Sequence, residues 1–287
     1  MDYATIKELI ELAEKEGLPI SEVVLRVEIG ETEQSREEIW QAMLENLGVM
    51  RESVATGRAG QIKSPSGLVG GDALKLRVNN TLIPGNFYRE VIINALAVAE
   101  VNAGMGKIVA GPTAGSSGII PAVVLALGEH LQLSDAQLTA GLFTAAGLGN
   151  VVAKRATLAG AAGGCQAECG VASAMAAGAS VELCGGNPNM VGQAFALALK
   201  NLLGLACDPV AGLVEVPCVK RNGFAASHAL TAAQMALAGI ESIIPPDEVI
   251  EAMHQIGCLM PASLKETALA GLAVTPTGLA IKERLNQ

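Results

Sequence analysis

The sequence predicts an all-α fold, or nearly so: a compact bundle of apolar helices rich in alanine and glycine. Of its 287 residues 51% are hydrophobic but only 2% are aromatic, so the core must be built from Ala, Val, Leu and Ile. Glycine occurs 33 times, and small side chains let helix backbones approach one another closely. The alternation of apolar and polar residues that is typical of strands is rare, whereas apolar residues recur at helical spacing.

Three helices are predicted near the N-terminus. The first begins at the capping box Thr5–Glu8, in which each side chain satisfies a free backbone N–H of the first turn, and it ends before Gly17 and Pro19. The second is expected to begin at Ser21 as its N-cap residue, and the third at the capping box Ser35–Glu38.

Charge divides the chain into two parts. Residues 1–53 hold 13 acidic and 5 basic side chains, whereas residues 54–287 hold 15 and 14. We therefore predict an acidic helical N-terminal segment, residues 1–57, and a nearly neutral catalytic domain, residues 58–287. The overall net charge of −9 argues against a nucleic-acid-binding protein, which needs a basic face to neutralise phosphates.

From Tyr88 onward, helical stretches alternate with breaks rich in Gly, Pro and Asn. These breaks lie at residues 112–118, 147–150, 184–189, 208–212 and 245–247. Two short segments, Ala73 to Val78 and Leu213 to Val216, are the best candidates for strands.

Long uncharged runs, such as residues 108–128, raise the question of membrane insertion. These runs contain Pro, Asn, Ser and Thr, and the Trp and Tyr residues expected at membrane interfaces are missing. The first residues are acidic and do not form a signal peptide. We expect a cytoplasmic protein with no membrane partner, whose apolar helices are buried in a core and against another chain, in an oligomer.

The turn at residues 111–118 precedes an apolar helix at 119–127. A glycine-rich turn that enters a helix offers free N–H groups and the positive end of the helix dipole to an anion. The turn could hold a substrate carboxylate or a phosphate, or it could be only a tight connection between helices. Its candidate binding residues are Thr113, Gly115, Ser116, Ser117 and Gly118.

Two further turns are candidates for substrate binding. Residues 63–72 are polar and glycine-rich and could fold over a ligand as a lid, with Ser64 and Ser66 as donors. Asn102 can donate and accept hydrogen bonds, and Lys107 can neutralise a carboxylate. On composition alone, turns of this kind are more often plain surface loops.

Six cysteines and the absence of any Cys-x-x-Cys pair argue against a zinc ribbon or a thioredoxin-type site. Cys165, Cys207 and Cys218 each lie in or beside a Gly/Pro turn, where backbone N–H groups can stabilise a thiolate. Buried structural cysteines more often lie within helices, as we expect for Cys258. Taken singly, each cysteine is more often a small buried apolar residue.

The sequence resembles the alpha chain of iron–sulfur L-serine dehydratases from about residue 3 to residue 280. The resemblance is carried by six segments that occur in the same order: Ser64–Gly67, Gly111–Gly118, Gly164–Gly170, Cys207–Gly212, Pro217–Asn222 and Pro261–Thr267.

The resemblance implies a [4Fe-4S] cluster bound by Cys165, Cys207 and Cys218, with Cys169 as the alternative to Cys165. Three thiolate ligands leave one iron open as a Lewis acid, which makes the hydroxyl of L-serine a feasible leaving group. The products would be pyruvate and ammonia, without pyridoxal phosphate. The family also implies a smaller beta chain as partner.

The general base stays unassigned. His130, His228 and His254 each lie within an expected helix, where a packed or surface histidine is common. Lys63 and Lys220 are possible local contributors, and the beta chain is expected to supply histidine. Two alternatives remain open: an L-cysteine desulfidase of the same superfamily, and a non-catalytic helical partner subunit.

Overall fold

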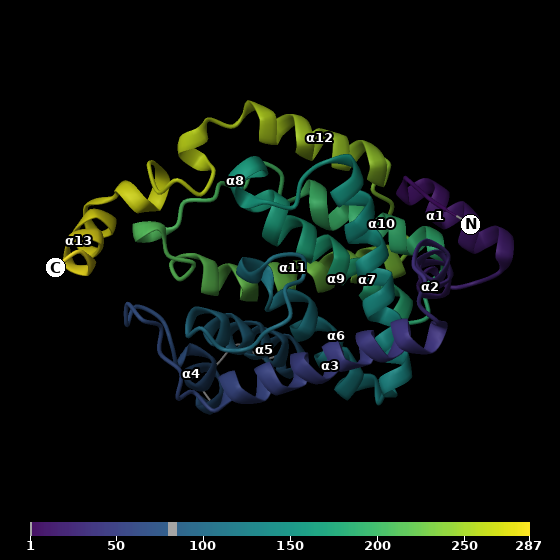
Figure 1. Ribbon diagram of the computed structural model, residues 1–287, viewed down its shortest axis with the longest axis horizontal. Coiled ribbons are helices and arrows are strands. Elements are labelled where there is room, and N and C mark those ends of the chain that lie inside the picture. Colours follow the sequence, from purple (N-terminus) through teal and green to yellow (C-terminus); the bar gives the residue numbers. More distant parts are fainter. Residues whose placement is uncertain (1, 80–84) are drawn as a thin grey trace.

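The computed structural model describes residues 2–79 and 85–287, and these form an all-α fold, as predicted (Figure 1). Within these described ranges there are thirteen α-helices, with short 3-10 or π turns between some of them. The described residues contain no strand, and their one isolated bridge joins Cys207 to Lys265.

The described residues up to Ala103 form the helices α1 (Ile6–Glu16), α2 (Ile20–Glu31), α3 (Arg36–Arg58), α4 (Asp72–Val78) and α5 (Asn86–Ala103). Both predicted capping boxes are confirmed, because Thr5 and Glu8 cap α1 and Ser35 and Glu38 cap α3. Helix α1 ends at Gly17, whose φ of 64° is left-handed, as expected for a glycine at this position.

The later helices are α6 (Ile119–Leu131), α7 (Asp135–Arg155), α8 (Gly160–Gly163), α9 (Val171–Leu183), α10 (Pro188–Lys200), α11 (Cys218–Leu237), α12 (Pro246–Leu259) and α13 (Pro276–Leu285). The short turns between them are η1 (Ala114–Ser116), η2 (Gln166–Gly170, a π turn), η3 (Val210–Gly212), η4 (Ala262–Leu264) and η5 (Gly271–Val274).

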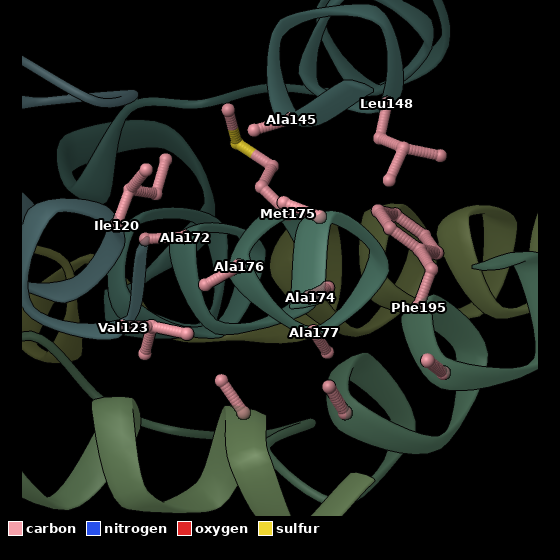
Figure 2. Packing of buried hydrophobic residues seen from close by; sticks show 14 of the residues in the cluster. Ile120, Val123, Ala145, Leu148, Ala172, Ala174, Met175, Ala176, Ala177 and Phe195 are labelled. Atoms are coloured by element: carbon pink, nitrogen blue, oxygen red, sulfur yellow. The ribbon is translucent and has the colours of Figure 1, made fainter. Parts of the chain in front are cut away.

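Helix α9 is the centre of the bundle. It packs against α6, α7, α10 and α11, and small residues around its whole circumference are buried between larger neighbours (Figure 2). A helix that is apolar all round requires such complete burial. At Gly178, an added Cβ would lie 2.3 Å from Leu148 Cδ1, so only glycine allows α7 to approach this closely.

The acidic N-terminal segment shares its core with the rest of the chain. Ile6 and Leu9 of α1 and Leu25 of α2 are fully or almost fully buried in the same apolar cluster as α9. Carboxylates from the body also bind the N-termini of both helices: Asp247 accepts hydrogen bonds from two N–H groups of α1, and Glu182 accepts one from Ser21 of α2. The division of the chain at residue 57 stays a prediction, and it falls one residue before the end of α3.

Both strand predictions are wrong. Ala73 to Val78 forms most of α4, because the carboxylate of Glu100 accepts hydrogen bonds from the N–H groups of Asp72 and Ala73 and so caps this helix from α5. Leu213 to Val216 forms an irregular turn, in which the Glu215 N–H donates to the Leu213 carbonyl.

The predicted N-cap of the second helix is also wrong. Helix α2 begins at Ile20, with Pro19 as its N-cap residue and without a side-chain cap. Ser21 therefore lies within the first turn, where its N–H donates to Glu182.

Two segments, Ala114–Leu131 and Asp135–Arg155, are long and apolar enough to cross a membrane by length and composition alone. In each, 67% of the apolar window is buried inside the protein, as is typical of core helices in soluble proteins. The absence of a membrane partner stays a prediction.

Candidate functional site

Four of the six cysteines gather in the interior of the bundle. Cys165 precedes the π turn that contains Cys169, Cys207 lies before η3, and Cys218 is the first residue of α11. Their side chains are only 2–8% exposed. Three segments that are separated in the sequence therefore bring four thiols into one buried cluster, which we call the thiol cluster.

The other two cysteines are exposed. The expectation of a buried Cys258 is thus wrong: it lies near the end of α12, on a face turned to solvent, and its thiol is 3.8 Å from His254 Nε2.

The thiol cluster favours one thiolate. Hydrogen bonds from the thiols of Cys169 and Cys207 lower the pKa of Cys165 to about 3, and the nearby Arg221 guanidinium adds to this effect. The charged Cys165 and burial raise the pKa values of Cys169 and Cys207, while burial raises that of Cys218 to about 12. More than one thiolate here requires an additional positive charge, such as a metal supplies.

Arg221 and Asp208 fix the segment that carries Cys207. Arg221 donates to the Ala206 carbonyl at 2.9 Å and to Asp208 Oδ1 at 2.8 Å. The other oxygen of Asp208 accepts a hydrogen bond from the Leu272 N–H at 2.8 Å. This ion pair therefore ties α11 to the Cys207 segment and to the C-terminal segment.

A second connection joins Cys207 to the C-terminal segment. The Cys207 N–H donates to the Leu264 carbonyl at 2.9 Å, and the Glu266 N–H donates to the Cys207 carbonyl at 2.8 Å. Glu266 has a φ of 64°, which is uncommon for a residue with a side chain and is often found at functional sites.

Glu168 connects the thiol cluster to the turn at 111–118. Its Oε2 accepts a hydrogen bond from the Thr113 hydroxyl at 2.8 Å, and its Oε1 accepts one from the Gly160 N–H at 2.8 Å. Burial raises the pKa of Glu168 above its ordinary value. One ligand atom each of Glu168, Cys207 and Glu266 lie within 4.8 Å of one another, so carboxylates line this side of the cluster.

Asn222 connects the same turn to Cys218. Its Nδ2 donates to the carbonyls of Gly115 at 2.8 Å and Cys218 at 3.0 Å. Its Oδ1 accepts a hydrogen bond from the Gly118 N–H, so this N–H is not free to bind a ligand.

The three hydroxyls of the turn differ in their partners. The Thr113 hydroxyl binds Glu168, and the Ser116 hydroxyl binds Thr113 and the Gly111 carbonyl. The Ser117 hydroxyl is buried and has no hydrogen-bond partner in the described part of the chain. Of the three, it is the one left to donate to a ligand.

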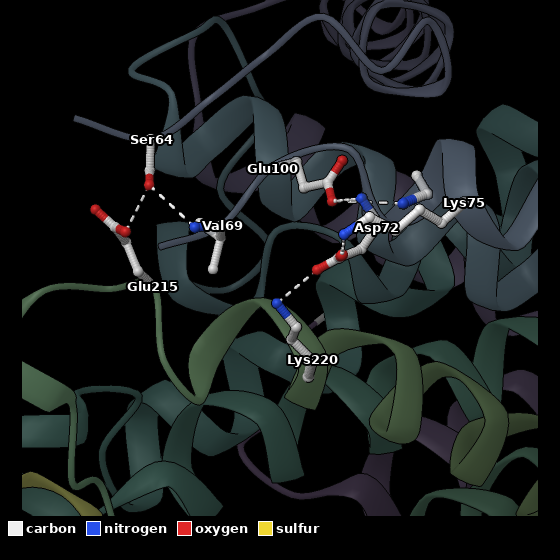
Figure 3. A network of polar contacts seen from close by, with 8 residues as sticks. Ser64, Val69, Asp72, Lys75, Glu100, Glu215 and Lys220 are labelled. Atoms are coloured by element: carbon white, nitrogen blue, oxygen red, sulfur yellow. Dashed lines mark hydrogen bonds and ion pairs between the residues drawn. The ribbon is translucent and has the colours of Figure 1, made fainter. Parts of the chain in front are cut away.

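The polar loop at 63–72 is attached to the same region (Figure 3). The hydroxyls of Ser64, at 2.6 Å, and Ser66 both donate to Oε2 of Glu215, which lies between Cys207 and Cys218 in the sequence. At the other end of the loop, Asp72 forms an ion pair with Lys220 of α11 at 2.6 Å. The loop is therefore fastened to the thiol cluster's own segment at two points.

The remaining candidates lie beside this loop. An added Cβ at Gly104 would contact Ile62, so the turn that follows α5 packs against the start of the loop. Asn102 is half-buried and Lys107 and Lys63 are exposed, and their side chains make no hydrogen bond or ion pair with the described residues.

The three histidines lie in helices, as predicted, and they pack elsewhere. The ring of His130 packs against that of Phe87 at a tilt of 44°, and His228 contacts the Ala198 carbonyl at 2.9 Å. His254 lies one turn from Cys258 in α12. None is hydrogen-bonded to the thiol cluster, to the turn at 111–118 or to the loop at 63–72, so the general base stays unassigned.

Sequence reasoning missed the polar residues that connect these segments. Glu168, Glu215, Arg221 and Asn222 all lie within or directly beside the cysteine segments. Their closeness in sequence to Cys169 or Cys218 was the only signal of a role at the site. The sequence did not reveal their hydrogen-bond partners, because most of these lie in other segments.

Comparison with known proteins shows which family the chain is similar to. A family model described as "Serine dehydratase alpha chain" matches residues 15–273. The chain is 49% identical over 286 residues to a probable L-serine dehydratase alpha chain of Bacillus subtilis, a match that covers 99% of this chain and 95% of the relative.

Two further relatives were compared. The L-serine dehydratase alpha chain of Peptoniphilus asaccharolyticus is 41% identical, with 97% of this chain and 96% of the relative covered. An L-serine dehydratase of Streptomyces coelicolor is 39% identical over 95% of this chain, and this match covers 61% of that protein. With a family model that spans most of the sequence and relatives that match nearly end to end, the chain belongs to the serine dehydratase alpha chain family.

Proposed function

We propose that the chain is the alpha subunit of an iron–sulfur-dependent L-serine dehydratase, a lyase that converts L-serine to pyruvate and ammonia. The observation that carries the proposal is the buried thiol cluster of Cys165, Cys169, Cys207 and Cys218. Relatives named L-serine dehydratase, alpha chain, support the substrate and the type of reaction.

The donor set fits an iron–sulfur cluster. Thiolates are the ligands that hold such clusters, and the described residues place four cysteines here with no histidine hydrogen-bonded among them. Cys165, Cys207 and Cys218 come from three separate segments, so they would hold a [4Fe-4S] cluster from three sides. The bound cluster would supply a Lewis acid for the hydroxyl group of serine.

The surrounding residues would bind and orient the substrate. The turn at 111–118 is held against the thiol cluster by Glu168 and Asn222, so a carboxylate bound at the turn would lie beside the cluster. Within the turn, Ser117 offers a hydroxyl with no other partner. The loop at 63–72, which is attached to Glu215 and Lys220, is suited to cover the bound substrate.

A beta chain is the proposed partner. The relatives are named as alpha chains, which implies a second subunit for them. Several large apolar side chains are strongly exposed here, such as Met105 at 84% and Phe224 at 80%. Such residues favour burial against another chain. The cytoplasmic location of the assembly remains part of the proposal.

The cluster is tested by anaerobic reconstitution of the chain with iron and sulfide. Alanine at Cys165, Cys207 or Cys218 should abolish the broad brown absorption and the bound iron. Alanine at the exposed Cys184 or Cys258 should retain both and serves as the control. Equal loss in all five variants, or a wild-type chain that binds no iron, would refute the cluster assignment.

The substrate is tested with the reconstituted alpha chain and its beta chain. L-Serine should yield equal amounts of pyruvate and ammonia. Sulfide released from L-cysteine at a higher kcat/KM would favour the desulfidase alternative. Bound iron without turnover of either amino acid would favour a non-catalytic subunit.

A further inference from the structure

We propose that the carboxylate of Glu215 binds the α-ammonium group of the substrate and so restricts the site to amino acids. This inference rests on the proposed function, because it takes L-serine as the substrate of this site. It concerns the positive charge of the substrate, whereas the turn at 111–118 serves the substrate carboxylate. An ammonium group carries three donors, and a carboxylate is its strongest acceptor.

Glu215 is a buried carboxylate without a positive partner. The buried acidic side chains in the described part of the chain are Glu100, Asp208 and Glu215. Asp208 forms an ion pair with Arg221, and Glu100 accepts hydrogen bonds from two N–H groups at the start of α4. Glu215 is 4% exposed, and the described residues give it only two serine hydroxyls as donors. A buried charge is destabilising unless it is paired, so this carboxylate is suited to a positive ligand.

One oxygen of this carboxylate is left for a ligand. The hydroxyls of Ser64, at 2.6 Å, and Ser66 both donate to Oε2, whereas Oε1 accepts no hydrogen bond from the described residues. In Figure 3 the dashed line from Ser64 reaches one of the two carboxylate oxygens. The two hydroxyls fix the orientation of the group, so Oε1 can accept a charged hydrogen bond without rearrangement.

The segment that carries Glu215 lies beside the turn at 111–118. A Cβ added at Gly115 would lie 3.5 Å from Val214 Cγ1, so the residue before Glu215 packs against this turn. The backbone of Glu215 is also fixed, because its carbonyl accepts a hydrogen bond from the Val219 N–H of α11 at 3.0 Å. The carboxylate and the ammonium group of an amino acid are attached to one carbon, so the groups that bind them must be neighbours, as this turn and this segment are.

The other carboxylates near the thiol cluster are less suited to this role. Both oxygens of Glu168 and both oxygens of Asp208 already accept hydrogen bonds from other residues of the chain. Glu266 is exposed, and an ion pair in contact with water contributes little. Of these carboxylates, Glu215 is the one that combines burial with an unoccupied oxygen.

The consequence is selection for a protonated α-amino group. A 2-hydroxy acid such as L-glycerate has the same carboxylate and the same β-hydroxyl as L-serine, but it offers Glu215 a neutral group. A site built around a hydrogen bond rejects an analogue that lacks it, because the buried group of the protein is then left unpaired. N-acylated serine should be excluded for the same reason.

The experiment compares two ligands that differ only in the ammonium group, L-alanine and propanoate. Their dissociation constants are measured by ligand-observed NMR titration of the reconstituted alpha chain with its beta chain. Wild type should bind L-alanine at least about tenfold more tightly than propanoate, as expected for one hydrogen bond to a charged group. Glu215→Gln should weaken the binding of L-alanine about 10- to 150-fold and should leave that of propanoate unchanged.

Two further variants serve as controls. Glu266→Gln removes the same charge from the exposed carboxylate beside Cys207, and it should keep the wild-type preference for L-alanine. Glu215→Asp keeps a carboxylate and should keep part of the preference. A merely structural role of Glu215 would weaken both ligands alike, since propanoate has no group that binds to Glu215.

Three outcomes would overturn the inference. Wild type could bind the two ligands equally, or Glu215→Gln could weaken both by the same factor. Alternatively, Glu266→Gln and not Glu215→Gln could abolish the preference, which would assign the ammonium group to Glu266. Failure of the proposed function gives a different result, namely no pyruvate from L-serine, because the binding comparison requires no turnover.

Discussion

The amide oxygen of Asn222 accepts a hydrogen bond from the backbone N–H of Gly118 at 2.9 Å, at the point where the turn enters α6. The nitrogen of the same amide donates to the Gly115 and Cys218 carbonyls. One side chain thus fixes the position of the proposed substrate turn relative to a proposed cluster ligand. The sequence predicts that the N–H groups at this helix N-terminus are free to bind a ligand. The N–H of Gly118 is instead bound by the side chain of Asn222.

Replacement of Asn222 should release the turn at 111–118 from the segment that carries Cys218. Asn222→Ala removes this side-chain partner from three backbone groups, and a buried group left unsatisfied lowers the free energy of unfolding by about 1–3 kcal/mol. We expect a lower free energy of unfolding and a fall in kcat/KM for L-serine, measured by urea unfolding and by pyruvate formation. Asn222→Asp keeps the acceptor for Gly118 but loses both donors, so it should resemble alanine. An Asn222→Asp variant with wild-type stability and turnover would contradict this account.

Two glycines of the turn should respond differently to alanine. At Gly118, an added Cβ would lie 2.4 Å from the backbone oxygen of Ala95, which cannot move aside. At Gly115, it would lie 2.8 Å from Oε2 of Glu168, at the end of a side chain that can move. Gly118→Ala should therefore lower the thermal unfolding midpoint strongly, since overpacking typically costs about 1–3 kcal/mol. Gly115→Ala should retain most of its stability but lose turnover, because Glu168 is displaced from Thr113. Equal effects of the two substitutions on stability would show that neighbouring atoms relax equally well at both positions.

Substitutions of Ser64, Ser66 and Glu215 should have coupled effects, because the three side chains form one hydrogen-bonded group. Both hydroxyls donate to the same oxygen of a buried carboxylate, so they are occupied in the chain without substrate. Ser64→Ala and Ser66→Ala should each lower the free energy of unfolding by up to about 1.5–3 kcal/mol, the range for hydrogen bonds to a charged group.

A double-mutant cycle with Glu215→Gln tests that coupling. Where the hydroxyls act through Glu215, the effects on unfolding and on kcat/KM should be clearly less than additive. Additive losses in kcat/KM would instead show that Ser64 and Ser66 bind the substrate independently of Glu215, as their place in a polar, glycine-rich loop predicts.

Local and distant interactions explain which predictions succeeded. The capping boxes at Thr5 and Ser35 were predicted because both partners lie three residues apart. Helix α4 was mistaken for a strand because its cap is Glu100, which lies 28 residues from Asp72 in the sequence. The assignment of Cys165, Cys207 and Cys218 as cluster ligands came from their segments and the family resemblance, and it stays a prediction. The hydrogen bonds of Glu168 with Thr113, of Glu215 with Ser64 and of Asn222 with Gly118 join residues that lie 55 to 151 positions apart, so only the fold reveals them.

The attachment of α2 to the body should depend on pH through Glu182. Its carboxylate accepts a hydrogen bond from the Ser21 N–H, but burial is the dominant effect and raises its pKa above the ordinary value of 4.5. A carboxyl group with a raised pKa in the folded chain contributes stability that is complete below the unfolded pKa and is lost as pH rises through the folded pKa.

Glu182→Gln removes this titration but keeps a side-chain acceptor for Ser21. The free energy of unfolding of wild type minus that of Glu182→Gln should therefore be largest near pH 4.5 and decrease toward pH 8, measured by urea unfolding at matched ionic strength. Glu45→Gln, at an exposed position on α3, serves as the control for a general loss of charge. A difference that increases with pH would mean that the hydrogen bonds to the ionised carboxylate outweigh its burial.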